Sequence, residues 1–208
     1  MKIDISRHMP SFLIKIVYNK PMSKNIKYTI EQTFLELLSH RPISEITIKE
    51  ITTKSGVNRN TFYYHYKNLA DLLESVIRKM VDEIIVNQPL STNNSLEDCF
   101  LSAVNFAITN RKIINNIYHS TNRAIFERHL WHICDYSISS FLGSLPNQNT
   151  SPVELDVIKD ILKFELFGFT IDWINHGMPS DVTEKIHILT ANLLPKYPNK
   201  GFYGNNQN

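Results

Sequence analysis

The chain has 208 residues, a net charge of +2 and 42% hydrophobic residues, so it is large and apolar enough to bury a core and is not disordered throughout. No apolar run reaches the roughly 18 residues of a spanning helix, so we expect no membrane association. The two cysteines, Cys99 and Cys134, lack the spacing of a metal knuckle or a disulfide scaffold. They suit a reducing compartment, and we expect a cytoplasmic protein without a cofactor.

Charge is uneven along the chain. Residues 1–68 carry eleven Lys and Arg against five Asp and Glu, a net charge of +6, whereas residues 69–208 have a net charge of −4. A basic N-terminal segment favours an anionic partner for residues 1–68, although ordinary scatter produces charge imbalances of this size. Residues 1–22 read as an N-terminal tail, of which residues 1–21 alternatively precede a start at Met22. Its apolar piece SFLIKIVY is too short for a signal peptide and is interrupted by Lys15.

Two helices are predicted before the first glycine. Apolar residues at helical spacing indicate the first of them, which ends near His40. Thr47 and Glu50 have the spacing of a capping box, in which the hydroxyl caps the helix and the carboxylate reaches back to the cap residue. This box opens a second, short helix over residues 48–55.

A tight turn and two more helices follow. Gly56 supplies the conformational freedom of the turn, and Asn58 caps a short third helix through about Tyr64. A fourth, longer helix opens at Asn68 and runs through Ile85.

A larger helical body begins after the predicted loop over residues 88–95. Helical patterns start at Ser95 and recur over 111–118, 122–142, 153–176 and 181–193, and no strand-like alternation appears. The expected fold is all-α. It has an N-terminal three-helix helix-turn-helix domain over residues 23–68, a C-terminal helical ligand-binding and dimerisation domain over residues 69–195, and a flexible tail over residues 196–208.

The two short helices joined by a glycine turn form a helix-turn-helix arrangement, whose second helix fits the major groove of DNA. Its first turn is polar. Arg59 has a fork that can bind guanine, Asn60 can pair with adenine, and Thr61 can meet a thymine methyl or a phosphate. The alternative is an amphipathic core helix with aromatic filler.

Other side chains of this region suit phosphate contacts. Tyrosine and histidine side chains can hydrogen-bond phosphates while their rings fill space, and a lysine adds a point charge. Phe62 and Tyr66 are expected to pack inward. The full predicted DNA-binding set is Thr47, Lys49, Arg59, Asn60, Thr61, Tyr63, Tyr64, His65 and Lys67.

From about Lys24 to Met80, these motifs resemble the DNA-binding domain of the TetR/AcrR family of bacterial transcriptional regulators. The family pattern has a Thr-initiated second helix, a GVS-type turn and a T-[LFI]-Y-x-[HY]-F-x-[NS]-K stretch. The chain departs from it at Tyr66, where phenylalanine is usual, and at Leu69, where the family usually has a lysine that contacts a phosphate. It matches at Thr47, Gly56, Val57, Thr61, Phe62, Tyr63, His65, Lys67 and Asn68.

A second resemblance covers the C-terminal part. The segment FELFGFTIDWINHGMPSDVTEKIHIL is similar to the ending of a TetR subgroup that includes DhaS-type regulators. In that subgroup some members repress, and others act as coactivators with a partner protein. The residues that carry the resemblance are Gly168, Trp173, Gly177, Met178 and Pro179.

The resemblance implies a homodimer formed through the last two helices and an effector pocket among the middle helices. The apolar residues of the first of these two helices fit such an interface, or are simply core: Val157, Ile158, Ile161, Leu162, Phe164 and Phe167. Pockets of this kind are mostly apolar with few polar groups. Candidate wall residues, each of a type that is more often core than pocket wall, are Phe100, Phe106, Tyr118, Phe126, Trp131 and Trp173, with His119, Arg123 and His132 as polar anchors.

His129, His132 and Cys134 form a candidate metal site. His129 and His132 share a helix face, but Cys134 projects away from them and no acidic cluster completes the set, so no metal is expected.

The sequence thus predicts a ligand-responsive repressor that binds a pseudo-palindromic double-stranded DNA operator as a homodimer. The alternative is a coactivator or interaction protein of the same fold that acts through a protein partner. An enzyme is not expected, because the chain has no nucleophile elbow, phosphate loop or Glu-His metal motif.

Overall fold

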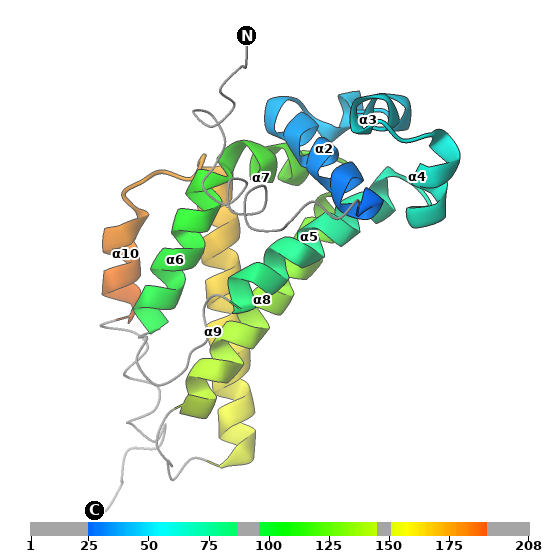
Figure 1. Cartoon of the computed structure of the whole chain (residues 1–208). Coiled ribbons are helices and arrows are strands. Elements are labelled where there is room, and N and C mark those ends of the chain that lie inside the picture. The colour runs from blue at the N-terminus through cyan, green and yellow to red at the C-terminus, as the bar shows by residue number, and fades with distance from the viewer. Residues whose placement is uncertain (1–24, 87–95, 145–150, 191–208) are drawn as a thin grey trace, which may run out of the picture. The chain divides into compact units, whose positions relative to one another are not determined.

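The computed structural model describes residues 25–86, 96–144 and 151–190. Regular structure in these ranges is helical, which confirms the predicted all-α fold. Within the same ranges, no helix combines the length and apolarity that crossing a bilayer requires. In chain order (Figure 1) the elements are α2 (Ile26–His40), the 3-10 turn η2 (Ile43–Glu45), α3 (Ile48–Ser55), α4 (Arg59–His65), α5 (Leu69–Val86), α6 (Leu96–Thr109), α7 (Arg111–Tyr118), α8 (Arg123–Ser144), α9 (Pro152–Asn175) and α10 (Val182–Ile188).

The described residues pack as two compact units. The first contains the residues up to Lys79 together with Phe106–Phe126, and the second contains Met80–Asn105 and the residues from Glu127 onward. The first unit is therefore assembled from two separate stretches of chain, and it holds the predicted helix-turn-helix.

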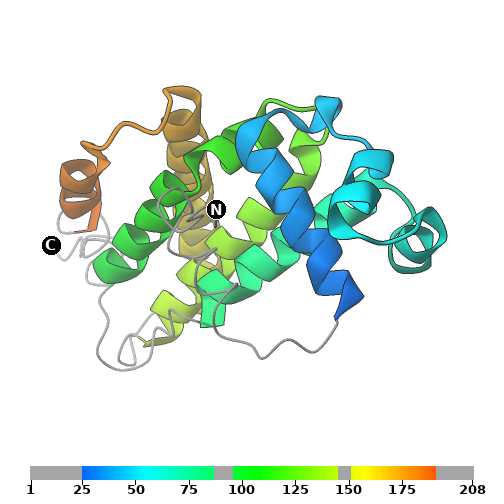
Figure 2. The same cartoon turned by 45° about the horizontal axis from the view of Figure 1, so that its top comes forward.

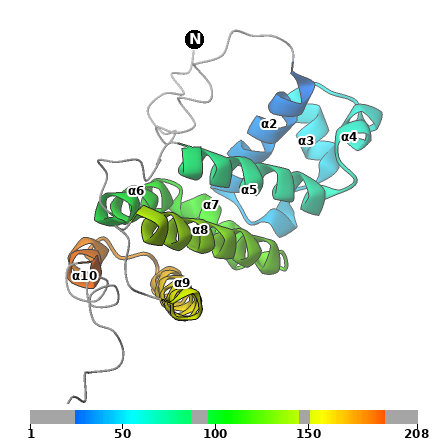
Figure 3. The ribbon, with the colours of Figure 1, turned by 90° about the horizontal axis from the view of Figure 1, so that it is seen from below.

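Helix α2 provides the core of the first unit. Asn25 caps its start by accepting a hydrogen bond from the backbone N–H of Tyr28 at 3.4 Å. Ile30, Phe34 and Leu38 are fully buried, because their spacing of four residues places them on one helix face. Helices α3 and α7 both pack against α2. Figures 2 and 3 show α3 beside α2 from two directions.

Helix α7 completes this core from the later stretch of chain. Ile113 and Ile117 are each only 1% exposed. Asn116 Nδ2 donates to the carbonyl oxygen of Leu38 at 2.7 Å and so satisfies an acceptor in the last turn of α2. Helix α7 therefore closes the apolar face of α2 and also caps its end.

A buried carboxylate joins α2 to the segments that follow α4. Glu31 is 2% exposed and accepts hydrogen bonds from Tyr66 Oη at 2.7 Å and Ser75 Oγ at 3.0 Å. Lys79 forms an ion pair with the same carboxylate. A buried charge is costly unless it is paired and hydrogen-bonded, and here all three donors come from beyond α4. Burial, reinforced by the hydrogen bond to Glu31, raises the pKa of Tyr66, so its phenol stays protonated and continues to donate.

The predicted capping box of α3 is only half correct. The Thr47 hydroxyl accepts from the backbone N–H of Glu50 at 3.2 Å, as expected. The Glu50 carboxylate, however, forms an ion pair with Arg41 instead of reaching back to the cap residue. A charged partner provides the stronger interaction, so this carboxylate ties the start of α3 to the end of α2.

Two helix pairs organise the second unit. Helices α8 and α9 lie side by side (Figure 1), where Trp131 packs on Phe164 and Phe167 with ring centroids 5.2 and 5.3 Å apart. Lys163 bridges the same pair by contacting Asp135 at 3.5 Å and the face of Trp131 at 4.9 Å. Helices α6 and α10 are joined through Glu97, which pairs with His187 of α10 and accepts from Thr190 just beyond that helix.

The turn between α9 and α10 contains two consecutive left-handed residues. Gly177 has φ of +81° and Met178 has φ of +54°, a conformation that is strained for methionine. Met178 is nonetheless fully buried, and Trp173 Nε1 donates across the turn to the carbonyl of Pro179 at 3.0 Å. Core packing therefore stabilises the strained residue.

Four predicted features fall partly or wholly outside the described residues. These are the N-terminal tail, the loop over 88–95, the C-terminal tail, and the last three residues of the helix predicted over 181–193. Within the described part, α10 ends at Ile188.

We predict that Tyr66→Phe destabilises the protein, although phenylalanine is usual at this position of the family pattern. The substitution leaves the buried Glu31 carboxylate with one donor fewer, which typically costs about 1–3 kcal/mol. Urea denaturation followed by circular dichroism measures the change.

Tyr64→Phe is the matched control, because Tyr64 is 85% exposed and loss of its hydroxyl should change the unfolding free energy by less than about 0.5 kcal/mol. Equal stabilities of the two variants would show that the Tyr66–Glu31 bond contributes nothing.

Candidate nucleic-acid interface

The turn between α3 and α4 depends on Gly56. This residue caps α3 with φ of +69°, in the left-handed region that glycine adopts without strain. Its neighbour Val57 donates from its backbone N–H to the carbonyl of Thr52 at 3.1 Å and closes the helix end. The chain can therefore start α4 only two residues later, as predicted for a helix-turn-helix.

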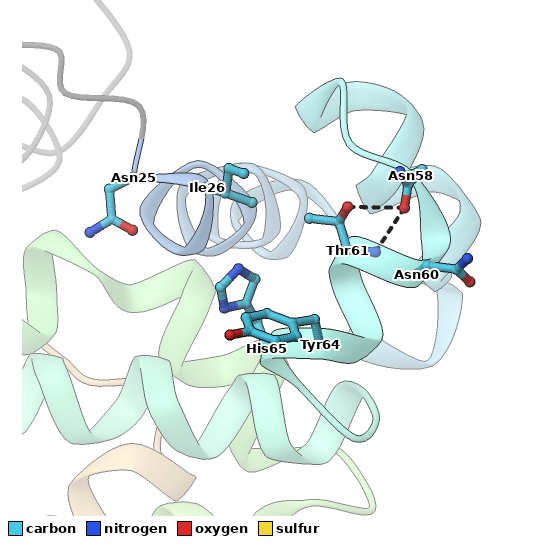
Figure 4. A pocket seen from close by; sticks show the side chains of 7 residues that line it. All are labelled: Asn25, Ile26, Asn58, Asn60, Thr61, Tyr64 and His65. Carbon is cyan, nitrogen blue, oxygen red and sulfur yellow. Dashed lines mark hydrogen bonds between the residues drawn. The ribbon is translucent and has the colours of Figure 1, made fainter.

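Asn58 caps α4 through a single side-chain oxygen. Asn58 Oδ1 accepts from the backbone N–H of Thr61 at 2.8 Å and from the Thr61 hydroxyl at 2.9 Å, as the dashed lines of Figure 4 show. The Thr61 side chain is thus held in one orientation by the cap. Its hydroxyl proton is engaged within the protein, which leaves the methyl group and the oxygen lone pairs for a partner.

Helix α4 has one buried face and one exposed face. Phe62 is fully buried and Tyr66, which follows the helix, is 2% exposed, so the prediction that both pack inward is confirmed. Arg59, Asn60 and Tyr64 are all exposed. The seven residues of α4 are too few to be stable alone, so the buried face fixes how the polar face is presented.

Arg59 and Tyr63 contact each other one helical turn apart. Arg59 Nη2 donates to Tyr63 Oη at 3.2 Å, and the guanidinium carbon lies 5.5 Å from the Tyr63 ring centroid. Tyr63 therefore has a partner within the helix. From sequence, the Tyr63 hydroxyl was predicted to contact a phosphate, and its pairing with Arg59 was not predicted.

A groove runs beside the exposed face of α4. It has a volume of about 610 Å³ and opens to solvent between the start of α2 and α4 (Figure 4). Three of its residues, Asn25, Ile26 and Asn58, were not predicted as site residues, and only the cap role of Asn58 was readable from the sequence. The lining residues are Asn25, Ile26, Asn58, Asn60, Thr61, Tyr64 and His65.

The remaining predicted DNA contacts flank α4. Lys49 and Lys67 are exposed, and Thr47 is exposed while its hydroxyl caps α3. The backbone N–H of Lys67 donates to Asp71 at 2.8 Å, which fixes the start of α5 and leaves the lysine side chain at the surface. The first unit thus contains all nine predicted DNA-binding residues.

The six predicted effector-contacting residues divide between the two units. Phe106, Tyr118 and Phe126 belong to the first unit, and Phe100, Trp131 and Trp173 belong to the second. Tyr118 is 1% exposed and packs its ring against Phe126 at 5.9 Å. Whether these residues contact an effector remains a prediction.

The polar residues proposed around them are at the surface. His119, Arg123 and His132 are exposed, and the Arg123 guanidinium lies 4.2 Å from the Tyr118 ring centroid.

Cys134 is buried, and burial raises the pKa of its thiol to about 12, so it is protonated at neutral pH. Within the described ranges no three His, Cys, Asp or Glu side chains are grouped for a metal ion.

Two family models match the chain. The model of bacterial regulatory proteins of the tetR family matches residues 34–76, which include α3 and α4. A model of a transcriptional regulator C-terminal region matches residues 94–194.

A curated relative is similar over the helix-turn-helix. The uncharacterized HTH-type transcriptional regulator YxbF of Bacillus subtilis (strain 168) is 40% identical over 57 residues. These residues are 27% of this chain and 15% of YxbF, so the similarity covers a small part of both proteins.

Solved structures share the fold over most of the chain. The dihydroxyacetone kinase operon activator DhaS superposes with a TM-score of 0.65 and 17% identity, covering 84% of this chain and 97% of its own. A protein from Shewanella sp. PV-4 assigned to the tetR family of transcription regulators has a TM-score of 0.51 and 16% identity, covering 81% of this chain and 97% of its own. At these identities the likeness concerns the fold alone.

We predict that Asn58→Ala destabilises the protein by about 0.5–2 kcal/mol, because α4 loses its cap and Thr61 loses the acceptor for its hydroxyl. Chemical denaturation measures the effect. Asn60→Ala is the control, since Asn60 is an exposed amide on the same helix whose side chain is not the cap; a loss as large as that of Asn58→Ala would contradict the capping role.

Proposed function

The chain belongs to the TetR family of transcriptional regulators, and from this premise we propose that it binds a pseudo-palindromic DNA operator as a homodimer and releases it when a small molecule binds. The observation that carries the proposal is the exposed polar face of α4, with Arg59 and Asn60, mounted on the buried Phe62 and Tyr66. Polar side chains at the start of a rigidly held helix suit the reading of base edges in the major groove.

The charge distribution of the first unit supports an anionic partner. Its described residues, 25–79 and 106–126, carry eleven Lys and Arg against six Asp and Glu, and the ion pairs of Glu31 with Lys79 and of Glu50 with Arg41 cancel equal numbers of each sign. Lys49 and Lys67 remain exposed near α4. Exposed cations of this kind contribute the sequence-independent part of DNA affinity.

An apolar stripe on α9 supports a homodimer. Val153, Val157, Ile161 and Phe164 recur at spacings of four, four and three residues, which places them on one helix face. They are 73%, 53%, 39% and 62% exposed. A second copy with the same stripe would remove this apolar area from water, and a two-fold dimer would place two α4 helices for two half-sites.

Linkage sets a requirement on the proposed regulation by a ligand. An effector that dissociates the regulator from DNA must bind the DNA-free state more tightly, and DNA must weaken effector binding by the same factor. We expect a small, largely apolar effector, because the predicted wall residues are aromatic. A compound that shifts the melting temperature but leaves DNA affinity unchanged is not such an effector.

The direction of regulation is proposed as repression. The fold is shared with DhaS, which is an operon activator, so activation through a protein partner is the alternative. A reporter fused to the regulated promoter distinguishes them: deletion of the regulator raises expression if it represses and lowers expression if it activates.

We predict different effects for Arg59→Ala and Lys67→Ala on binding to DNA from upstream of the protein's own gene. Loss of Arg59 should weaken recognition of one base position by about 1–3 kcal/mol, whereas loss of Lys67 should weaken binding to all sequences and lower the salt slope by about one. Fluorescence anisotropy with a salt titration measures both quantities. Equal effects of the two variants on specific and random DNA would contradict base reading by Arg59.

We predict that the protein sediments as a dimer at micromolar concentration and that Phe164→Glu sediments as a monomer, because a charge is placed within the apolar stripe. Operator affinity should fall about 30-fold or more, as for a residue that dominates an interface. Phe164→Leu keeps an apolar side chain and is the control that should remain dimeric. A monomeric wild-type protein, on and off DNA, would rule out the proposed interface.

A further inference from the structure

The contact between Arg59 and Tyr63 links two side chains of the exposed α4 surface. Both residues are exposed, Tyr63 to 44%, yet the guanidinium donates to the phenolic oxygen at 3.2 Å and lies over the ring. A free arginine side chain loses rotamer entropy when it is ordered. A guanidinium already held by a neighbour loses less of it on binding.

Tyr63 is itself fixed by the core. Its ring meets Phe62 edge-on, at 90° and with centroids 5.6 Å apart, and Phe62 is fully buried. Phe62 in turn packs on Tyr66, which Glu31 holds. The Arg59 guanidinium is thus linked through the partly exposed Tyr63 ring to the buried side chains of the first unit.

We propose that Tyr63 is a positioning residue, which aims the Arg59 guanidinium at a base and so sets specificity, instead of serving primarily as a phosphate ligand. This inference rests on the proposed function of α4 in reading DNA. Bidentate recognition of guanine requires the plane of the fork to match the base edge, so the orientation of the fork affects one base position more than total affinity.

Tyr64, on the same helix, is suited to contact a phosphate and not to position Arg59. It is 85% exposed, and its ring meets His65 edge-on at 5.0 Å. A phosphate contact by Tyr64 would contribute equally to all sequences, because phosphates carry no sequence information.

The test is selection of binding sites from a random DNA library by the wild-type protein and by Tyr63→Phe, Tyr64→Phe and Arg59→Lys. Tyr63→Phe keeps the ring but removes the oxygen that accepts from Arg59. Preference at the base position that Arg59 reads should fall roughly two- to tenfold, the range for loss of one hydrogen bond, with random-DNA affinity and salt slope unchanged. Arg59→Lys should lose preference at the same position, because it keeps the charge without the fork.

A double-substitution cycle gives an independent readout. In an Arg59→Ala background, Tyr63→Phe should have no further effect on base preference, since nothing remains to be positioned. Additive effects would overturn the proposal, as would a uniform loss of affinity for all sequences in Tyr63→Phe like that expected for Tyr64→Phe. If the wild-type protein enriches no sequence, the proposed DNA-reading function fails; if it enriches one that Tyr63→Phe enriches equally well, only the positioning role fails.

Discussion

The buried carboxylate of Glu31 is the constraint on which the geometry of the first unit depends. A charge at 2% exposure is tolerated only because Tyr66, Ser75 and Lys79 all supply donors to it. These donors lie after α4, so satisfying Glu31 requires that α2 and α5 up to Lys79 take up one arrangement around α4. A helix of seven residues has little stability of its own, and its orientation is therefore imposed by this polar contact and by the burial of Phe62.

Local features of the fold were predictable because local chemistry determines them. Asn58 and Asn68 are caps whose side chains accept from backbone N–H groups three residues later, so the starts of α4 and α5 follow from sequence alone. Long-range partners were not predictable. Glu31 and its donors are 35 to 48 residues apart, and no spacing rule connects them. Glu50 fits a capping box by sequence, but its carboxylate binds Arg41, a charged partner nine residues away.

The candidate nucleic-acid interface and the predicted effector pocket also contain some features that the sequence predicts and others that it does not. The pattern of apolar and polar residues along α4 predicted which of them are exposed. The pairing of Arg59 with Tyr63 was not predicted, although a spacing of four residues on a helix is a readable signal for such a contact. Aromatic residues of the body could not be assigned from sequence, because a core residue and a pocket wall have the same composition. On α9 only packing separates Ile158 and Leu162, which are buried within the chain, from the exposed stripe that contains Phe164.

The first unit is discontinuous, and this bears on when it can form during synthesis. The chain leaves this unit after Lys79 and returns to it at Phe106. A nascent chain that has emerged only as far as α5 already contains the complete α4 sequence, but Ile113 and Ile117 are not yet present to cover α2. The helix-turn-helix therefore reaches its final packing only after the ribosome has translated α7, and a truncated product that ends between the two stretches exposes an unfinished core to chaperones and proteases.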